Sequence, residues 1–328
     1  MQSISRRGFV FSAAAAAAAF GLDGPLEIIS AARAQGAPDL KAKGFAKFKV
    51  GDWNVTTIYD GVWERALDAN LAKNAPLDEV KAASKAAGYP DSITPITFTV
   101  TVAEKNGQII MFDSGTGGGQ AGGPKAGLLA KENLAKAGID PAKISKILVT
   151  HYHGDHIFGL MAKDTNAQVF PNAEIVVPEA EHKYWSAPDL IEKLPEARKG
   201  LAKRIQATLP TWKNVKQVAA GAEAAPGIKA INTNGHTPGH TSFELASGTV
   251  KLVVSGDVTN VHALFAKNPE WHFVGDQDPE LAVKSRRALF EQAVKDGSVL
   301  TGYHWGMPGA GTLKKDGNGY VLVPVTAA

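Results

Sequence analysis

Short runs of apolar residues separated by polar turns dominate the first third of the chain, and they predict β-strands. Residues 45–64 read as a pair of strands. Thr97–Val102 and Gln108–Phe112 flank the dipeptide Asn106-Gly107. This dipeptide favours a type I′ turn, because both of its residues tolerate positive φ angles. We therefore expect a tight β-hairpin over residues 97–112.

Four later apolar runs end at a turn that carries a histidine or an aspartate. They are residues 146–150 before His151, 227–231 before His236, 250–254 before Asp257, and 298–301 before His304. Short apolar runs of this kind are typical of buried strands. Open sheets hold their ligands at the carboxyl ends of strands, so we expect these four polar residues to meet at one edge.

Helical patterns alternate with these strands. The expected helices cover residues 128–137, 179–186, 196–209 and 279–296. The last is the clearest, because Asp278 can cap it, Pro279 suits its first position and Gly297 ends it. Its buried face is expected to hold Leu281, Ala282, Ser285, Ala288, Leu289 and Ala293. In the helix at 179–186, His182 lies in a charged stretch and is expected to be solvated.

A closing strand is expected at residues 320–325. The mixture of strands and helices indicates an α/β (α+β) protein. No internal repeat and no break in the pattern divides the chain beyond its first 34 residues, so we expect residues 35–328 to form a single domain.

The stretch His151-Tyr152-His153-Gly154-Asp155-His156 brings three imidazoles and a carboxylate into six residues. Alternate side chains of an extended segment point the same way, so His151 and His153 can face one point. If a helix follows, Asp155 and His156 face a second point close by. Neutral imidazole and carboxylate suit zinc, iron, cobalt, nickel and manganese. A metal site explains this spacing better than its alternative, a solvated His-rich turn.

Residues 1–34 read as an export signal of the twin-arginine type. Ser5-Arg6-Arg7-Gly8-Phe9-Val10 resembles the twin-arginine consensus, and Ala32-Arg33-Ala34 offers a cleavage site. The apolar run between them, residues 9–20, is shorter than the roughly 20 residues of a membrane-spanning helix. We therefore expect a periplasmic protein without stable membrane insertion after cleavage. An N-terminal anchor that is never cut is the alternative.

Composition narrows the chemistry further. A net charge of +3, with both signs interspersed, argues against nucleic acid or another polyanionic partner. The chain contains no cysteine, so a metal site must use nitrogen and oxygen ligands only. We expect a small-molecule substrate, and a homodimer is compatible with this composition.

The spacing H-x-H-x-D-H at residues 151–156 resembles the signature of the metallo-β-lactamase superfamily. The resemblance implies a four-layer αββα sandwich of two mixed β-sheets, with one or two metals at the edge between them.

Carried over to this chain, the resemblance assigns seven metal ligands. His151, His153 and His236 would hold one cation; Asp155, His156 and His304 would hold a second; and Asp257 would bridge both. His236 is preferred to His240, the second histidine of Gly235-His236-Thr237-Pro238-Gly239-His240. His240 and Asp113 would orient the ligands without binding the metal, and Thr237, Pro238 and Gly239 would serve the turn alone. Two divalent ions are implied, zinc first, with manganese, iron or cobalt as alternatives.

A closer resemblance is to the branch that holds methyl parathion hydrolases and quorum-quenching lactonases. Four stretches carry it: residues 52–56, residues 170–173, the turn at 235–241, and residues 304–311. One departure lies three residues after the bridging aspartate. Quorum-quenching lactonases often have tyrosine there, and this chain has Asn260.

The resemblance implies a hydrolase in which a bridging hydroxide attacks an aryl ester, a lactone or an organophosphate triester. Asp155 and Asp257 would move the proton, and Trp185, Asn260 and Trp305 would line the substrate pocket. An N-acyl homoserine lactonase is the alternative. Two further alternatives are a β-lactamase and a non-catalytic metal-binding protein.

Overall fold

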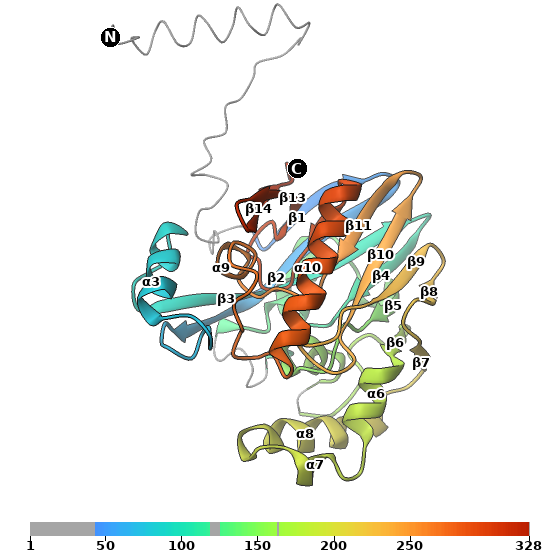
Figure 1. Cartoon of the computed structure of the whole chain (residues 1–328). Coiled ribbons are helices and arrows are strands. Elements are labelled where there is room, and N and C mark those ends of the chain that lie inside the picture. Colours follow the sequence, from blue (N-terminus) through green and yellow to red (C-terminus); the bar gives the residue numbers. More distant parts are fainter. Residues whose placement is uncertain (1–42, 119–124, 163, 328) are drawn as a thin grey trace, which may run out of the picture. The chain divides into compact units, whose positions relative to one another are not determined.

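The computed structural model describes residues 43–327, apart from 119–124 and 163. The expected signal at residues 1–34 lies outside this range. Within it, two seven-stranded sheets form the centre of the protein (Figure 1).

The first sheet has its strands in the order of the sequence, β1 to β7. They are β1 (Phe45–Val50), β2 (Trp53–Ala66), β3 (Ile93–Lys105), β4 (Gln108–Phe112), β5 (Ile144–Leu148), β6 (Glu174–Pro178) and β7 (Val215–Val218). β1 to β4 pair antiparallel, whereas β4 to β7 pair parallel. The sheet is therefore mixed, as expected.

The hairpin between β3 and β4 has the expected turn. Asn106 and Gly107 have φ angles of 53° and 75°, and Lys105 pairs with Gln108 across them. Positive φ at both turn positions is the type I′ geometry, whose twist matches that of the strands. β3 is longer than the expected 97–102 because it continues along β2 well past the hairpin.

The second sheet runs in the order β14-β13-β12-β11-β10-β9-β8. Its strands are β8 (Glu223–Ala225), β9 (Ile228–Asn232), β10 (Thr241–Ser247), β11 (Val250–Val254), β12 (Val299–Thr301), β13 (Ala310–Asp316) and β14 (Gly319–Pro324). Only β11 and β12 pair parallel, so this sheet is mixed as well.

The two sheets pack face to face through alternate residues of their strands. Phe112 of β4 meets Phe243 of β10 with ring centroids 5.7 Å apart, and both side chains are buried. Each side chain of this size contributes roughly 1.5–3 kcal/mol when fully removed from water. This apolar layer fixes the distance between the sheet edges and therefore the position of the loops at those edges.

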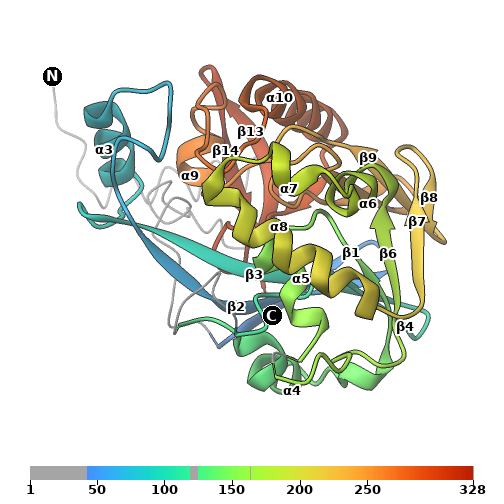
Figure 2. The same cartoon turned by 90° about the horizontal axis from the view of Figure 1, so that it is seen from below.

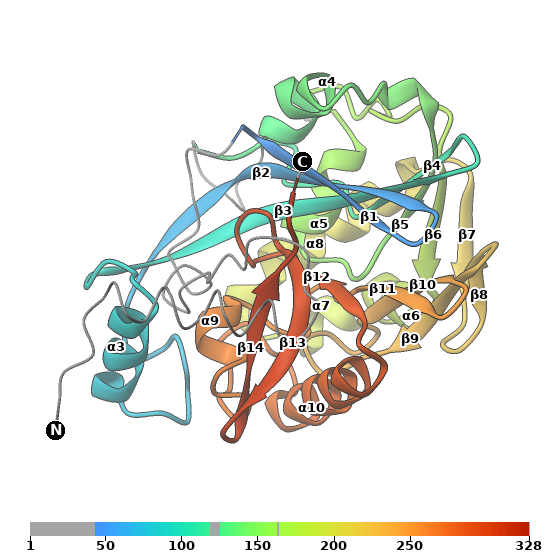
Figure 3. The same ribbon diagram turned by 90° about the horizontal axis from the view of Figure 1, so that it is seen from above.

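Helices cover the outer face of each sheet, which completes the expected αββα order (Figure 3). The α-helices of the described residues are α3 (Leu77–Ala86), α4 (Leu134–Lys136), α5 (Gly154–Ile157), α6 (Glu179–Ser186), α7 (Leu190–Lys193), α8 (Glu196–Thr208), α9 (His262–Phe265) and α10 (Pro279–Asp296). Of these, α3 lies beyond the ends of β2 and β3 and covers no sheet face (Figure 3). Figure 2 shows α8 running beside α5. Among the described residues, no helix is both long and apolar enough to span a membrane.

Short turns of other helix types complete the secondary structure. The expected helix at 128–137 begins as a π-helical turn, η2 (Leu129–Asn133), before α4. The 3-10 turns are η3 (Pro141–Lys143), η4 (Phe158–Leu160) and η5 (Leu209–Thr211).

Helix α10 begins and ends where the sequence predicts. The Asp278 carboxylate accepts a hydrogen bond from the Leu281 amide at 3.0 Å, and Gly297 ends the helix with a φ of 62°. The expected buried face was only partly right, because Ala288 is exposed. The residues that are buried instead share one side of the helix: Ala282, Val283, Arg286, Leu289, Phe290 and Ala293. The buried face of α10 therefore lies on a slightly different side of the helix from the expected one, because it includes Arg286, which the apolar pattern does not predict to be buried.

Gly159 of η4 supports the loop that follows β4. Its amide donates to the carbonyl oxygen of Gly115 at 3.0 Å, and the Ser114 amide donates to the carbonyl oxygen of His156 at 2.7 Å. A Cβ atom added at Gly159 would lie 1.8 Å from the carbonyl oxygen of Ser114. The two backbone segments are therefore in contact, with no room for a side chain.

We predict that Gly159→Ala destabilises the protein, because backbone must move to admit the methyl group. The free energy of unfolding in urea should fall by about 1–3 kcal/mol or more, the range for overpacked sites. Gly200→Ala is the matched control, since nothing lies within 4 Å of a Cβ atom there. In the middle of α8 that change should stabilise by about 0.5–1 kcal/mol. Equal midpoints for the two variants would contradict this packing.

Candidate metal centre

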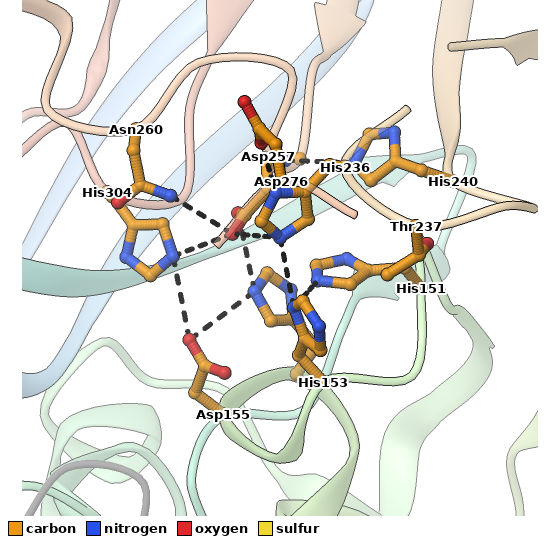
Figure 4. Close-up of polar contacts among 12 residues, drawn as sticks. His151, His153, Asp155, His236, Thr237, His240, Asp257, Asn260, Asp276 and His304 are labelled. Atoms are coloured by element: carbon orange, nitrogen blue, oxygen red, sulfur yellow. Dashed lines mark hydrogen bonds and ion pairs between the residues drawn. The ribbon is translucent and has the colours of Figure 1, made fainter. Parts of the chain in front are cut away.

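The polar residues predicted from the sequence meet at the edge between the sheets (Figure 4). His151 lies just past the end of β5, and Asp155 and His156 lie on the first turn of α5. His236, Asp257 and His304 follow β9, β11 and β12, respectively. Four strand ends therefore supply the site, as the apolar runs predicted.

Three ring nitrogens form the first group of donors. Nδ1 of His153 lies 2.9 Å from Nε2 of His151 and 2.9 Å from Nε2 of His236. His151 and His236 are almost completely buried. Three imidazole nitrogens at this separation turn their lone pairs toward one point.

A second group lies on the other side of Asp257. Nε2 of His156 and Nε2 of His304 each lie 3.5 Å from Oδ2 of Asp155. Asp257 contacts both groups, since its Oδ2 lies 2.9 Å from Nε2 of His304 and 3.3 Å from Nε2 of His236. Its Oδ1 lies 3.3 Å from Nε2 of His156. Asp257 thus has the position expected of a bridge.

These donors fit two divalent cations. The ligand atoms fall into three overlapping groups within 4.8 Å: His151–His153–His236, His151–His156–Asp257 and Asp155–His156–His304. Nε2 of His156 and Oδ1 of Asp257 are buried and accept or donate no hydrogen bond among the described residues. A buried polar atom without a partner costs about 1–3 kcal/mol, which bound cations would offset. An all-nitrogen and oxygen donor set suits zinc, manganese, iron or cobalt.

The outer nitrogens of three ligand rings are held by buried acceptors. Nδ1 of His156 lies 2.8 Å from Oδ2 of Asp113, and Nδ1 of His304 lies 2.7 Å from the carbonyl oxygen of Thr97. Nδ1 of His236 lies 2.8 Å from Oδ1 of Asp276. Each acceptor fixes the proton on Nδ1 and leaves the Nε2 lone pair free for a cation.

His240 lies beside the ligands. Its Nε2 accepts a hydrogen bond from the Asp257 amide at 3.0 Å, and its Nδ1 lies 3.1 Å from the carbonyl oxygen of Thr233. Burial lowers the pKa of His240 to about 3, which keeps the ring neutral. Because both ring nitrogens have partners, His240 has no lone pair left for a metal ion and instead supports the backbone of Asp257.

The charges of the site favour cations. Burial lowers the pKa values of His151 and His153 well below the ordinary value for histidine, so both rings are neutral donors. Burial also opposes a proton on His156, yet the carboxylates of Asp257, Asp155 and Asp113 hold its pKa well above its usual range. This raised pKa reflects a concentration of negative charge, which divalent ions would neutralise.

Glu181 supports the site, although its place in a charged stretch of helix predicts a solvated side chain. It is fully buried, and four groups donate to its carboxylate. Oε1 accepts from the Tyr152 amide at 2.9 Å and from Nε1 of Trp185 at 2.7 Å. Oε2 accepts from the Thr237 hydroxyl at 2.8 Å and from the Gly239 amide at 2.9 Å. One carboxylate therefore joins the His151–His153 loop to the turn that carries His236.

This arrangement corrects two expectations about neighbouring residues. Thr237 and Gly239 do more than form a turn, because both bind Glu181. A Cβ atom at Gly239 would lie 2.0 Å from the Glu181 amide nitrogen, so glycine is required for the approach. His182 is half-buried, with its Nδ1 2.9 Å from the Tyr152 hydroxyl, and is not a solvated surface residue.

Asp276 and Arg286 form a second support that the sequence did not reveal. The Asp276 carboxylate contacts His236 through Oδ1, and its Oδ2 lies 3.4 Å from Nη2 of Arg286. Arg286 also donates to the carbonyl oxygens of Val258, at 2.9 Å, and Pro269, at 2.7 Å. The buried arginine thereby fixes the loop between Asp257 and α10.

A cavity of about 640 Å³ opens above the donors. Its floor contains Asp155, Asp257 and His304, and Asn260 lines it beside them. Nδ2 of Asn260 donates to Oδ2 of Asp257 at 3.3 Å. The apolar walls include Trp63, Ile96, Phe98, Phe158, Leu201 and Phe273.

The structure contradicts the expected pocket role of Trp185 and Trp305. Neither lines the cavity. Trp185 is fully buried in the apolar core, and its indole Nε1 donates to Glu181. Trp305 is buried against α10, and its Nε1 donates to the carbonyl oxygen of Thr259 at 3.0 Å. The tryptophan that does line the cavity is Trp63, near the end of β2, which is 45% exposed.

Residues 98–304 match the family model described as "Metallo-beta-lactamase superfamily". Among curated relatives, an N-acyl homoserine lactonase of Bacillus sp. is 31% identical over 170 residues, covering 51% of this chain and 58% of the relative. An uncharacterized protein, YobT of Bacillus subtilis (strain 168), is 31% identical over 160 residues, covering 46% and 64%. The chain thus spans about three fifths of the length of these relatives.

Solved structures match over most of the chain, among them AidC and AbOPH. AidC, a dizinc quorum-quenching lactonase in complex with a product, N-hexanoyl-L-homoserine, has a TM-score of 0.79 at 26% identity, covering 86% of this chain and 98% of that one. AbOPH, a hydrolase in the beta lactamase superfamily, has a TM-score of 0.78 at 28% identity with the same coverage.

We predict that Glu181→Gln weakens metal binding while the fold survives. A glutamine amide nitrogen cannot accept, so two of the four donors lose their partner, at about 1–3 kcal/mol each. Metal affinity, measured by titration against a chelator, should fall by about 10–100-fold, the usual effect of losing a group that orients ligands.

Glu179→Gln is the matched control, because Glu179 is exposed on the same helix. It should bind metal as the wild-type protein does. Unchanged metal affinity in Glu181→Gln would show that the carboxylate does not position the ligands.

Proposed function

Because the chain belongs to the metallo-β-lactamase superfamily, we propose that it is a dinuclear metal-dependent hydrolase that cleaves carboxylic ester or lactone bonds. The observation that carries this proposal is the position of Asp257, which contacts two groups of metal donors at the floor of a cavity. A site built only to store a metal would have no need of an open chamber above it.

Two divalent cations held by these seven residues would polarise a substrate carbonyl and make water nucleophilic at neutral pH. The protein's own residues supply orientation and proton transfer. Asp155 is the carboxylate best placed to carry a proton to the leaving group, since its side chain is 17% exposed toward the cavity whereas that of Asp257 is 3% exposed. The Asn260 amide holds Asp257 in place from the cavity wall.

The walls favour a substrate with an apolar arm. Phe98, Phe158 and Leu201 can bury a hydrocarbon chain, and the cavity volume of about 640 Å³ lies within the range of small-molecule sites. Relatives that are N-acyl homoserine lactonases support lactones within this class. Organophosphate triesters suit the same donor set and belong in any substrate panel.

We predict that Asp257→Asn abolishes hydrolysis, because the amide removes the negative charge shared by the two groups of donors. Turnover of dihydrocoumarin, an acyl homoserine lactone, 4-nitrophenyl butyrate and methyl parathion should be compared with the metal content of each preparation. Wild-type protein should hold two metal ions per chain and hydrolyse at least one ester or lactone. The variant should lose at least about 10³-fold in kcat/KM.

His151→Ala should behave in the same way, and Asp78→Asn is the control, since Asp78 is an exposed carboxylate on α3. Hydrolysis that survives in metal-free Asp257→Asn protein would refute the proposal. Wild-type protein that holds two metals and hydrolyses nothing in the panel would favour a non-catalytic metal-binding role.

We also propose that the protein is exported to the periplasm, on the basis of the twin-arginine pattern at residues 5–10. Replacing both Arg6 and Arg7 by lysine should leave the full-length chain in the cytoplasm, as judged by cell fractionation and mass spectrometry. Periplasmic protein of unchanged amount in the double variant would overturn this proposal.

A further inference from the structure

Arg204 is a half-buried cation in the wall of the cavity. It lies on α8, whose residues Ala197, Gly200 and Leu201 face the same space. Its Cζ atom lies 3.6 Å from the centroid of the Phe158 ring, so the guanidinium stacks on an aromatic face. Stacking of this kind holds an arginine in place and leaves the N–H groups at its edge available.

Phe158 connects this cation to the metal centre. A Cβ atom added at Gly154 would lie 2.3 Å from Cε2 of Phe158, so the ring packs directly on the glycine. Gly154 joins His153 to Asp155, which belong to the two groups of metal donors. The guanidinium is therefore one aromatic ring away from the loop that holds the ligands.

The charge of Arg204 has no partner among the described residues. No described carboxylate forms an ion pair with it, and no described group accepts a hydrogen bond from it, although Lys199 on the same helix pairs with Glu196 at 2.9 Å. The other charged groups of the lining, Asp155 and Asp257, are metal donors. A cation in a partly desolvated wall, with free donors, is suited to bind an anion.

We propose that Arg204 binds a carboxylate at the far end of the substrate's acyl arm, so that esters or lactones bearing a terminal carboxylate are preferred over neutral ones. This inference rests on the hydrolase function proposed above. The planar guanidinium matches a carboxylate in a two-point hydrogen bond, while Phe98, Phe158 and Leu201 contact the intervening hydrocarbon.

The first test compares charged and neutral substrates of equal length. We expect the 4-nitrophenyl half-esters of adipic and suberic acid to be hydrolysed about 10-fold more efficiently than their methyl-capped forms, mainly through KM. Arg204→Gln should remove this preference, so that the ratio of kcat/KM between the half-ester and its methyl-capped form falls to about 1. Lys203→Gln, the same charge change at an exposed neighbour, should keep it. Equal preference in wild-type protein and Arg204→Gln would overturn the inference.

A binding measurement separates this inference from the proposed function. Metal-loaded wild-type protein should bind suberate about 10-fold more tightly than monomethyl suberate in isothermal titration calorimetry, and Arg204→Gln should bind both alike. Arg204→Lys keeps the charge and should retain part of the difference, which guards against a folding defect in Arg204→Gln. If no ester is hydrolysed but this binding difference is present, the hydrolase proposal fails and the carboxylate site stands. If esters are hydrolysed but wild-type protein and Arg204→Gln bind suberate with equal affinity, the carboxylate site is refuted and the hydrolase proposal stands.

Discussion

The hydrogen bond on the outer nitrogen of three of the five ligand imidazoles is the interaction on which the metal centre depends. A neutral imidazole has one bare nitrogen, and the partner of the other nitrogen decides which one it is. Asp113 makes this choice for His156, Asp276 for His236 and the Thr97 carbonyl for His304. These partners come from the end of β4, the loop before α10 and β3. The orientation of the ligands thus requires both sheets and the apolar layer between them.

The groups that orient the ligands include carboxylates that are themselves buried. Burial raises the pKa of Asp113 and of Glu181, and in both cases hydrogen-bond donors oppose the rise. Donors satisfy each carboxylate: Thr150 gives Asp113 its amide at 2.7 Å and its hydroxyl at 2.8 Å. Removing a single donor from such a network leaves an anion poorly compensated in a low-dielectric interior, which is far more costly than losing a surface hydrogen bond. The same contacts therefore stabilise the fold and hold the ligands.

The sequence predicted the parts of the site whose members are neighbours in the chain or follow a strand. His151 to His156 were identifiable because four donors fall within six residues, and His236, Asp257 and His304 because each ends an apolar run. Glu181 and Arg286 were not, because a charged residue in a helix normally indicates a solvated face. Burial of Glu181 is favourable only because distant groups donate to it, and burial of Arg286 only because distant carbonyl oxygens accept from it. The spacing of residues within a helix cannot predict such distant partners. Trp185 was placed wrongly for the same reason, since its indole serves the hidden carboxylate.

The floor and the wall of the cavity are built from different parts of the protein, and this separation has a consequence for specificity. The floor consists of ligands that are fixed by several buried contacts each, so almost any substitution there disturbs metal binding. The wall formed by α8 is anchored chiefly through Ala202 and Ile205, which are buried beneath it. Among the described residues, no side chain of its cavity face, from Ala197 to Arg204, forms a hydrogen bond with a group that orients a metal ligand, although Arg204 contacts the ligand loop through Phe158. We therefore expect substitutions on the cavity face of α8 to change substrate preference more than they change metal binding.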